Sequence, residues 1–357
     1  TAVAANPSRS GKSGCAMQSL EEAPPQGYPS GVLIRNRLED LPALGVPLHL
    51  ALGVFDGVHV GHQAVIARAV DAAAREGGLA GLLTFDPHPI RVIAPGKAPT
   101  ALLGTLNHKA RVMEGLGVRL FIPLHFDIEF ARMEASEFIE RLMAAPVRTI
   151  AVGEDWRFGH NRGGDVNFLQ QEAARRGFKL EAVAPVMHDG ERVSSTRIRQ
   201  AIRDGNLHAA EQMLGRPYSV AGKVIEGQKL GRTIGFPTAN LATGEAQLPP
   251  DGVWAVRVIL PDGRDLAGVA NLGLRPTVGG DSRSLEVHLL DRQIEVLVPR
   301  DGDFVLFLGF GFRGHSARGY SPGALWRKKN VIGAPPAFFL AFATERLFLS
   351  RDFMDTE

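Results

Sequence analysis

Two histidines three residues apart, His59 and His62, stand at the expected start of a helix that follows a short apolar strand. A helix N-terminus offers free backbone N–H groups and partial positive charge. Gly61 would let the backbone approach a phosphate closely, and both imidazoles can donate hydrogen bonds to phosphate oxygens. Such a set suits displacement at phosphorus, where catalysis is mostly positioning and charge stabilisation. Capping or solvent-facing histidines are the alternative, and the position directly after the strand favours the phosphate interpretation.

A second set of phosphate-compatible residues opens a later helix, in Ser194-Ser-Thr-Arg-Ile-Arg199. Its hydroxyls can cap the helix, and Arg197 and Arg199 can pair with a phosphate. Taken alone, this segment would be interpreted as an ordinary capping box with surface arginines.

The third set lies in a Gly-rich, basic segment, residues 222–240, which could arch over phosphates with its backbone N–H groups. Thr238 and Asn240 are two residues apart, so an extended backbone points both to one side. Neutral oxygens suit Mg²⁺ that is already bound by nucleotide phosphates. A Gly/Pro turn before a strand is the alternative for this segment.

The elements that must hold the first two sets alternate between strand and helix. This alternation predicts a parallel α/β sheet, in which ligands bind beyond the carboxyl ends of the strands. The loops after Val54, Phe85 and Val152 lie at those ends. We expect strands at residues 48–54, 79–85, 119–124, 148–152 and 179–184, and helices at residues 61–76, 107–116, 134–144 and 167–176.

After about residue 215 the pattern changes to short β-rich segments separated by Gly, Pro and Asp-Gly turns. Several short strands with few helices indicate a small barrel or sandwich. No amphipathic helix is visible in residues 316–357, where Pro322, Pro335 and Pro336 argue against one. The expected strands are residues 218–225, 253–260, 266–272, 284–290, 294–298 and 304–308.

Composition narrows the class of protein. The 357 residues carry a net charge of +2, which gives no reason to expect a nucleic-acid or membrane partner. The single cysteine, Cys15, can form neither an internal disulfide nor a zinc site alone. No apolar run reaches the ~18 residues of a membrane span, so we expect a cytoplasmic protein. Met17 is the first methionine, and residues 1–30 are expected to be a disordered or non-native tail.

In order along the chain, these motifs resemble the adenylyltransferase module of bacterial bifunctional riboflavin kinase/FAD synthetases. The resemblance spans residues 32–215 and includes Leu83-Thr-Phe-Asp-Pro-His-Pro89, Val152-Gly-Glu-Asp-Trp-Arg-Phe-Gly159, Arg162-Gly-Gly-Asp165, Phe126-Asp127 and Glu137-Phe-Ile139. It implies transfer of AMP from ATP to FMN, with His59 and His62 as catalytic residues. It also implies ATP and phosphate binding by Gly53, Phe55, Asp56, Gly57, Gly61, Ser195, Thr196 and Arg197, and flavin binding by Phe85, Pro87, His88, Asp155 and Phe158.

The second half resembles the riboflavin kinase module of the same family, through residues 222–240, 268–277 and 285–291. The resemblance implies that Glu286 is the general base that takes the proton of the ribityl 5′-hydroxyl. The alternative for Glu286 is a solvent-facing strand residue. It further implies a Mg²⁺ site at Thr238 and Asn240, and ATP binding by Gly222, Gly231, Arg232, Phe236 and Pro237. Beyond about residue 291 the resemblance ends, by divergence or by a shifted reading frame.

We therefore expect a Rossmann-like nucleotidyltransferase domain with a parallel sheet, followed by an antiparallel β-barrel. The expected boundaries are residues 31–204 for the first domain, 205–216 for a linker, 217–312 for the barrel and 313–357 for a divergent tail. The expected function is phosphorylation of riboflavin to FMN and adenylylation of FMN to FAD, by a monomer or weak homo-oligomer that uses ATP and Mg²⁺. Three alternatives stay open: FMN adenylyl transfer only, with an inactive flavin-binding barrel; a non-catalytic nucleotide or RNA binder; and a nucleotidyltransferase acting on another phosphorylated compound.

Overall fold

The computed structural model describes residues 31–99, 101–226, 237–260, 262–277, 280–290 and 303–312. These residues form two compact units that are interleaved along the chain. Unit 1 consists of residues 31–54, 62–98 and 110–184, and unit 2 consists of residues 55–61, 99, 101–109 and those from 185 onward. The consecutive domain boundaries drawn from the sequence stay a prediction.

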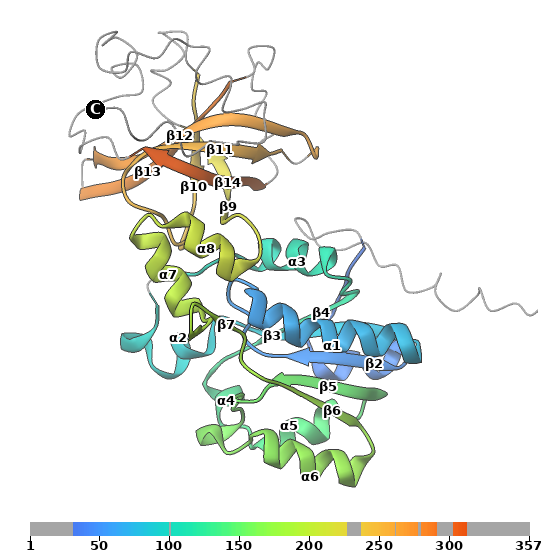
Figure 1. Cartoon of the computed structure of the whole chain (residues 1–357). Coiled ribbons are helices and arrows are strands. Elements are labelled where there is room, and N and C mark those ends of the chain that lie inside the picture. The colour runs from blue at the N-terminus through green and yellow to red at the C-terminus, as the bar shows by residue number, and fades with distance from the viewer. Residues whose placement is uncertain are drawn as a thin grey trace, which may run out of the picture. The chain divides into compact units, whose positions relative to one another are not determined.

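Unit 1 contains a parallel sheet, as the alternation of strands and helices predicts. Six strands of the described residues lie in the order β1-β4-β3-β2-β5-β6, and Figure 1 labels β2 to β6. All neighbouring strands in it are parallel. The strands are β1 (Leu33–Ile34), β2 (Leu48–Leu52), β3 (Leu79–Asp86), β4 (Leu120–His125), β5 (Val147–Gly153) and β6 (Lys179–Val183).

The sheet is doubly wound about β2. The chain runs outward from β2 through β3 to β4 and then returns to β5 on the other side of β2. Because parallel crossovers are right-handed, this reversal places helices on both faces of the sheet. It also creates a switch point at the carboxyl ends of β2 and β5, where open α/β sheets bind ligands. The main helices are α1 (Val60–Glu76), α3 (Leu106–Gly115), α5 (Ala135–Leu142) and α6 (Val166–Arg176).

The core of unit 1 follows from the apolar periodicity of these elements. All five residues of β2 are buried, which is typical of a central strand covered on both faces. In α5, the buried residues Ala135, Phe138, Ile139 and Leu142 fall at helical spacing and pack into the same core as Leu50. Shorter elements complete the unit: α2 (Pro89–Ile93), α4 (Ile128–Ala131) and the 3₁₀ turns Leu38–Asp40, Pro42–Leu44, Pro95–Lys97 and His160–Arg162.

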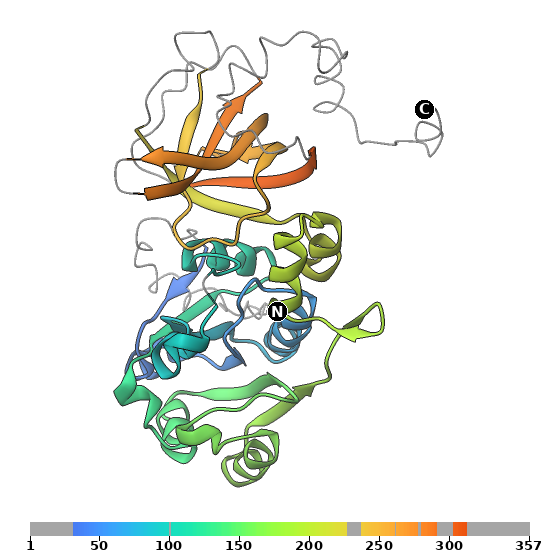
Figure 2. The ribbon, with the colours of Figure 1, turned by 90° about the vertical axis from the view of Figure 1, so that its left-hand side faces the viewer.

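Unit 2 contains a closed antiparallel barrel, as the β-rich second half predicts. Figure 2 shows the barrel strands, coloured from yellow to red-orange. Within the described residues the order is β10-β13-β12-β11-β14-β9, and pairing of β9 with β10 closes the barrel. The expected strand at residues 294–298 lies outside the described residues. The strands are β9 (Ser219–Ile225), β10 (Ala239–Ala242), β11 (Gly252–Ile259), β12 (Asp265–Thr277), β13 (Gly280–Leu289) and β14 (Asp303–Phe312).

Two helices belong to the same unit as the barrel. Helix α7 (Ser195–Arg203) begins at the N-cap Ser194, and α8 (Leu207–Leu214) ends at Gly215 in the left-handed conformation. Ile198 of α7 and Met213 of α8 belong to one buried cluster with Leu272 of the barrel. The segment expected as a linker is therefore helical and contributes to the core. A two-stranded hairpin, β7 (Met187–His188) and β8 (Glu191–Arg192), precedes α7.

Candidate active sites

The loop between β2 and α1, which belongs to unit 2 from residue 55 onward, has an unusual backbone conformation. Phe55, Gly57 and Val58 have φ values of 51°, 79° and 42°. Positive φ is rare for non-glycine residues and is an outlier for a β-branched one such as Val58. Gly57 is needed there for a further reason, since a Cβ would come within 2.7 Å of Leu103 Cδ1. Strained backbone of this kind persists only where its surroundings enforce it, and it gathers at functional sites.

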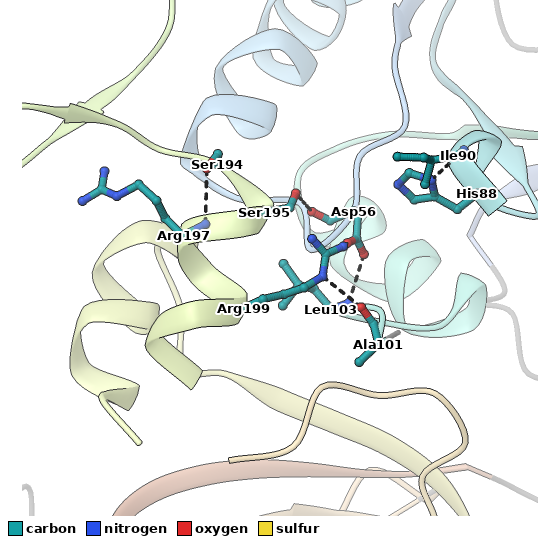
Figure 3. Close-up of polar contacts among 9 residues, drawn as sticks. All are labelled: Asp56, His88, Ile90, Ala101, Leu103, Ser194, Ser195, Arg197 and Arg199. Atoms are coloured by element: carbon teal, nitrogen blue, oxygen red, sulfur yellow. Dashed lines mark hydrogen bonds and ion pairs between the residues drawn. The ribbon is translucent and has the colours of Figure 1, made fainter. Parts of the chain in front are cut away.

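Helix α7 and residues 101–103 hold this loop in place (Figure 3). The hydroxyl of Ser195 donates to the carbonyl oxygen of Asp56 at 2.9 Å. The Asp56 carboxylate accepts the N–H of Leu103 at 3.0 Å and forms a buried ion pair with Arg199. Arg199 also donates to the carbonyl oxygen of Ala101 at 2.9 Å. Asp56 and Ser195, both expected to bind ATP, are therefore bonded to the protein's own groups.

His59 follows the strained residues and is buried, with 7% of its surface exposed. Burial lowers the pKa of its imidazole from 6.5 to about 4, and the positive charges of Arg192 and Arg216 act in the same direction. A Cβ on Gly61 would lie 3.2 Å from the His59 ring, so this glycine makes room for the imidazole. The second histidine, His62, lies in the first turn of α1, belongs to unit 1 and is half-buried.

The two arginines of α7 point in different directions (Figure 3). Arg199 points to Asp56, so the expectation that it pairs with a phosphate is wrong for this conformation. Arg197 points away from Asp56. Its guanidinium donates to the carbonyl oxygens of Glu191 and Arg192, each at 3.0 Å, and pairs with the Glu191 carboxylate at 3.1 Å. Arg197 thus holds the β7–β8 hairpin, and the neighbouring Thr196 is exposed.

In unit 1, the strands next to the switch point end in the motif loops. The buried Gly53 follows β2 and donates its N–H to the carbonyl oxygen of Leu83 at 3.2 Å. After β3, Pro87 is exposed, and His88 caps α2 through Nδ1, which accepts the N–H of Ile90 at 3.3 Å. After β5, Asp155 is exposed to solvent. The expected flavin-binding loops therefore begin at the carboxyl ends of parallel strands.

Two of the expected flavin-binding residues, Phe85 and Phe158, are mostly buried in an aromatic row. Phe85 packs edge-on against Phe126, with ring centroids 5.6 Å apart, and Phe158 stacks on Trp156 at 4.4 Å. Phe138 contacts Phe158 from the core side at 5.7 Å. The rings consequently form a rigid support behind the loops. The complete row is Phe126, Phe85, Phe130, Phe138, Phe158, Trp156 and Phe168.

The barrel brings the expected kinase residues together. Asn240 on β10 and Asn271 on β12 both lie directly opposite Glu286 on the intervening strand β13. Directly paired residues point to the same face of a sheet, so these three side chains form one polar row. Thr238 donates its hydroxyl to Glu286 Oε2 at 3.3 Å. Glu286 and Asn240 are buried, so the interpretation of Glu286 as a solvent-facing strand residue is wrong.

Asn240 has an acceptor atom that is free to bind a ligand. Its Oδ1 is buried and has no hydrogen-bond partner among the described residues. A buried acceptor left unsatisfied costs about 1–3 kcal/mol, so such atoms commonly serve a ligand. Within the part of the chain that the structure describes, no group of three or more His, Cys, Asp and Glu side chains could hold a metal ion. The neutral oxygens of Thr238 and Asn240 fit a hard cation that arrives with its own phosphate ligands.

The remaining expected ATP-binding residues of the barrel divide into two groups. A Cβ on Gly222 would lie 2.6 Å from the carbonyl oxygen of Ala242, so this glycine allows β9 and the end of β10 to approach closely. The carbonyl oxygen of Pro237 accepts a hydrogen bond from His288 Nδ1 at 2.8 Å. The other three, Gly231, Arg232 and Phe236, lie outside the described residues.

Several residues around the strained loop gave no usable signal in the sequence. Arg216 donates to the carbonyl oxygens of Gly57 and Val58, although it is 158 or more positions away along the chain. Leu102 forms a bridge with Ala246, a pairing that joins the 101–109 segment to a segment between barrel strands. Arg216, a lone arginine before a proline, and the apolar pair Leu102 and Leu103 match no sequence motif. Only contacts between distant segments reveal their place beside the loop.

Family models match both halves of the chain. A model described as FAD synthetase matches residues 46–197, and one described as riboflavin kinase matches residues 214–302. The chain is 41% identical over 244 residues to the bifunctional riboflavin kinase/FMN adenylyltransferase of Escherichia coli strain K12, covering 68% of this chain and 78% of that protein. It is 42% identical over 243 residues to the protein of that name from Pseudomonas fluorescens, covering 67% and 77%.

A solved structure extends the likeness to the fold. A crystal structure described as a macrolide-efflux protein from Streptococcus pneumoniae superposes with a TM-score of 0.69 at 27% identity. It covers 84% of this chain and 96% of that one. Among the helices of the described residues, none has the length and apolar character needed to cross a membrane. On the two matched models and these relatives, the chain belongs to the bifunctional riboflavin kinase/FMN adenylyltransferase family and is a transferase that makes FMN and FAD.

Proposed function

We propose that the strained loop of unit 2 binds the phosphates of ATP during FMN adenylylation. In this reaction an oxygen of the FMN phosphate attacks the α-phosphorus of ATP, and the bond to pyrophosphate breaks. The loop supports this role because its conformation is enforced by Ser195, Arg199 and Leu103 before any substrate binds. Preorganised donors stabilise developing charge without reorganisation during the reaction.

His59 supports the same proposal through its charge state. With a pKa of about 4, its imidazole is neutral at physiological pH and presents one N–H as a donor. The positive charges of Arg192 and Arg216 that lower this pKa also favour anionic phosphate in the same corner of unit 2. We assign His62 a parallel donor role from the first turn of α1, where helix N–H groups are free.

For the flavin, we propose that the loops after β3 and β5 in unit 1 supply the contacts. Pro87, His88 and Asp155 are exposed or half-buried and can meet a ligand. Phe85 and Phe158 are assigned to the same site as the aromatic support beneath these loops. The left-handed backbone of Asn161 and Arg162, with φ of 52° and 60°, marks the loop after β5 as strained in the manner of ligand loops.

For riboflavin phosphorylation, we propose Glu286 as the general base. Its carboxylate takes the proton of the ribityl 5′-hydroxyl while that oxygen attacks the γ-phosphorus of ATP, and ADP leaves. Thr238 and Asn240 would hold Mg²⁺, which neutralises the charge of the ATP phosphates. The single observation that carries this assignment is the buried, unpartnered Oδ1 of Asn240 in one row with Glu286.

Product analysis tests both assignments together. The full chain is mixed with ATP and MgCl₂ and with either riboflavin or FMN, and the flavins are separated by chromatography. FAD from both substrates, with FMN as the intermediate from riboflavin, is the expected result. FAD from FMN without FMN from riboflavin would contradict the proposed kinase site and restore the alternative of an inactive barrel.

We further propose that the enzyme acts in the cytoplasm, as a monomer or weak homo-oligomer, on the small molecules riboflavin, FMN and ATP. The near-neutral net charge of +2 supports small-molecule substrates rather than nucleic acid. Light scattering coupled to size-exclusion chromatography would give the mass of the particle in solution. A stable large assembly would contradict this part of the proposal.

A further inference from the structure

Arg216 donates two hydrogen bonds to consecutive carbonyl oxygens of the strained loop. Nη2 donates to the carbonyl oxygen of Gly57 at 2.7 Å, and Nη1 donates to that of Val58 at 2.9 Å. The planar guanidinium fork therefore spans two consecutive peptide groups, which a lysine ammonium cannot reproduce. Gly57 and Val58, whose carbonyl oxygens accept these bonds, have φ of 79° and 42°, so Arg216 clamps the loop at two residues with left-handed backbone.

Among the described residues, no carboxylate pairs with the guanidinium of Arg216. Its third acceptor is the carbonyl oxygen of Leu214 at 3.2 Å, and its Nε is buried with no hydrogen-bond partner among the described residues. Leu214 is the last residue of α8, and the negative end of a helix dipole stabilises a cation there. Burial lowers the pKa of Arg216 to about 10, so the guanidinium stays protonated at neutral pH. Within the described part of the chain, carbonyl dipoles rather than a carboxylate thus offset this buried positive charge beside the loop.

His59 responds to this charge. Besides burial, the charges of Arg192 from β8 and of Arg216 lower the pKa of the imidazole, whereas a hydrogen bond with the backbone of His59 itself raises it. A positive group that excludes a proton from the imidazole also attracts the phosphates of a nucleotide. Arg216 therefore combines two effects on one loop: it fixes the peptide groups that precede His59, and, together with Arg192, it makes the potential around the ring more positive.

We propose that Arg216, which lies in the part of the chain matched by the riboflavin kinase model, is a positioning residue for the FMN adenylylation site. This inference rests on the proposed role of the His59 loop. Arg216 is the second residue after α8 and the third before β9, within the 214–302 match. The half of the chain that phosphorylates riboflavin thereby supplies a clamp to the half that adenylylates FMN.

The test compares Arg216→Gln, which removes the charge and the fork, with Arg216→Lys, which keeps the charge alone. Both full-length variants are assayed for the two activities. Arg216→Gln should lower kcat/KM for ATP in FMN adenylylation by ~10²-fold, as small displacements of catalytic groups do. Arg216→Lys should fall between this variant and the wild type. Riboflavin phosphorylation should be unchanged in both. Arg257→Ala, which removes an exposed arginine paired with Asp265 on the barrel, is the matched control and should affect neither activity.

The pH profile separates positioning from simple structural support. Removing a positive charge raises the pKa of His59, so the acidic limb of FMN adenylylation should move to higher pH in Arg216→Gln. In Arg216→Lys the limb should stay in place, and an NMR titration of the His59 ring should show the same pattern. If Arg216→Gln does not fold, Arg216→Lys decides: partial loss with an unmoved limb supports the proposal.

Two outcomes overturn the proposal, and a third distinguishes it from its premise. Wild-type adenylylation in either foldable variant contradicts the clamp. Equal loss in both variants with an unchanged His59 titration reduces Arg216 to a structural residue and also overturns it. His59→Ala is measured in parallel. If this variant keeps the wild-type rate of FMN adenylylation, the proposed function of the loop has failed. If His59→Ala loses this activity and the Arg216 variants keep it, the clamp alone is refuted.

Discussion

Asp56 and Arg199 form an ion pair across 143 positions of sequence, and both side chains are less than a tenth exposed. The pair joins the loop after β2 to helix α7 within unit 2. Phenolic Tyr218 lies near enough that the Asp56 charge adds to burial in raising the pKa of its hydroxyl. The buried charges of Asp56 and Arg199 are therefore matched to each other, and removal of one leaves the other uncompensated.

Arg199→Ala should consequently destabilise the protein strongly. Loss of one partner of a buried ion pair costs about 3–5 kcal/mol, because the remaining charge is left without compensation in a poorly solvated position. Urea unfolding measures the free energy of unfolding. Arg203 lies on the same helix, is exposed and donates to the side chain of Gln200, so Arg203→Ala should change the free energy of unfolding by less than about 0.5 kcal/mol. Similar values for the two variants would contradict the role of the pair.

His59→Ala and His62→Ala should each reduce FMN adenylylation while leaving riboflavin phosphorylation intact. Loss of a preorganised donor to the reacting phosphate typically costs ~10²–10³ in rate. Initial rates with FMN and ATP give the effect, and His208→Ala on the exposed side of α8 is the control histidine. A rate near wild type in either variant would remove that histidine from the site.

The acid stability of the protein should depend on His59. Its pKa is 6.5 when unperturbed and about 4 in the folded protein, so between these values the unfolded chain binds more protons. The free energy of unfolding therefore falls as pH drops from 6.5 to 4, by about 3 kcal/mol from this residue, and is unaffected by it at higher pH. Urea unfolding of wild type and His59→Gln across this range isolates the contribution. Parallel pH curves for the two proteins would show that the imidazole is not held neutral.

Glu286→Gln should abolish riboflavin phosphorylation and leave FMN adenylylation at the wild-type rate. Glutamine keeps the size and one acceptor oxygen for Thr238, but it cannot take the hydroxyl proton, and loss of a general base costs ~10²–10⁴ in rate. Asp265→Asn, at the exposed start of β12, is the control for a carboxylate lost from the barrel. Retained phosphorylation in Glu286→Gln would exclude proton transfer to this carboxylate.

Asn240→Leu should separate stability from activity. Replacing a buried, unpartnered acceptor with an apolar side chain of similar size should leave the free energy of unfolding unchanged or raise it by about 1 kcal/mol. Riboflavin phosphorylation should nevertheless fall and require more Mg²⁺, whereas FMN adenylylation serves as the internal control.

Excess chelator should stop both wild-type reactions, because the metal is expected to arrive with ATP. For the variant, an unchanged Mg²⁺ dependence of riboflavin phosphorylation in Asn240→Leu would show that Asn240 does not belong to the metal site.

The strands and helices that position these residues could be predicted because their signals are local. The apolar run at 48–54 and the helical spacing in 61–76 are visible in short windows, and the structure has the strand at Leu48–Leu52 and the helix at Val60–Glu76. Motif positions such as Glu286 and Asn240 were also identifiable. Their direct pairing across β10 and β13 was not, since register depends on the closed barrel.

The roles of individual residues around the loop were harder to predict, because they depend on contacts between distant segments. Gly61 was expected to admit a phosphate, which stays a prediction, and the space that its missing Cβ leaves for the His59 ring could not be read from the sequence. Arg199 was expected at a phosphate and instead neutralises Asp56. An arginine at a helix start is compatible with both uses, and only the three-dimensional neighbours decide between them.

The stacking of Trp156 on Phe158 also provides an optical probe. Three tryptophans occur in the chain: Trp156 lies in unit 1, Trp254 is buried in unit 2, and Trp326 lies outside the described residues. Replacing Trp326 together with one of the other two by Phe leaves a single emitter that reports on one unit. Fluorescence of such variants would follow the unfolding of each unit separately. A change in stability could then be assigned to the unit where it arises, without the assumption that the whole chain unfolds in one step.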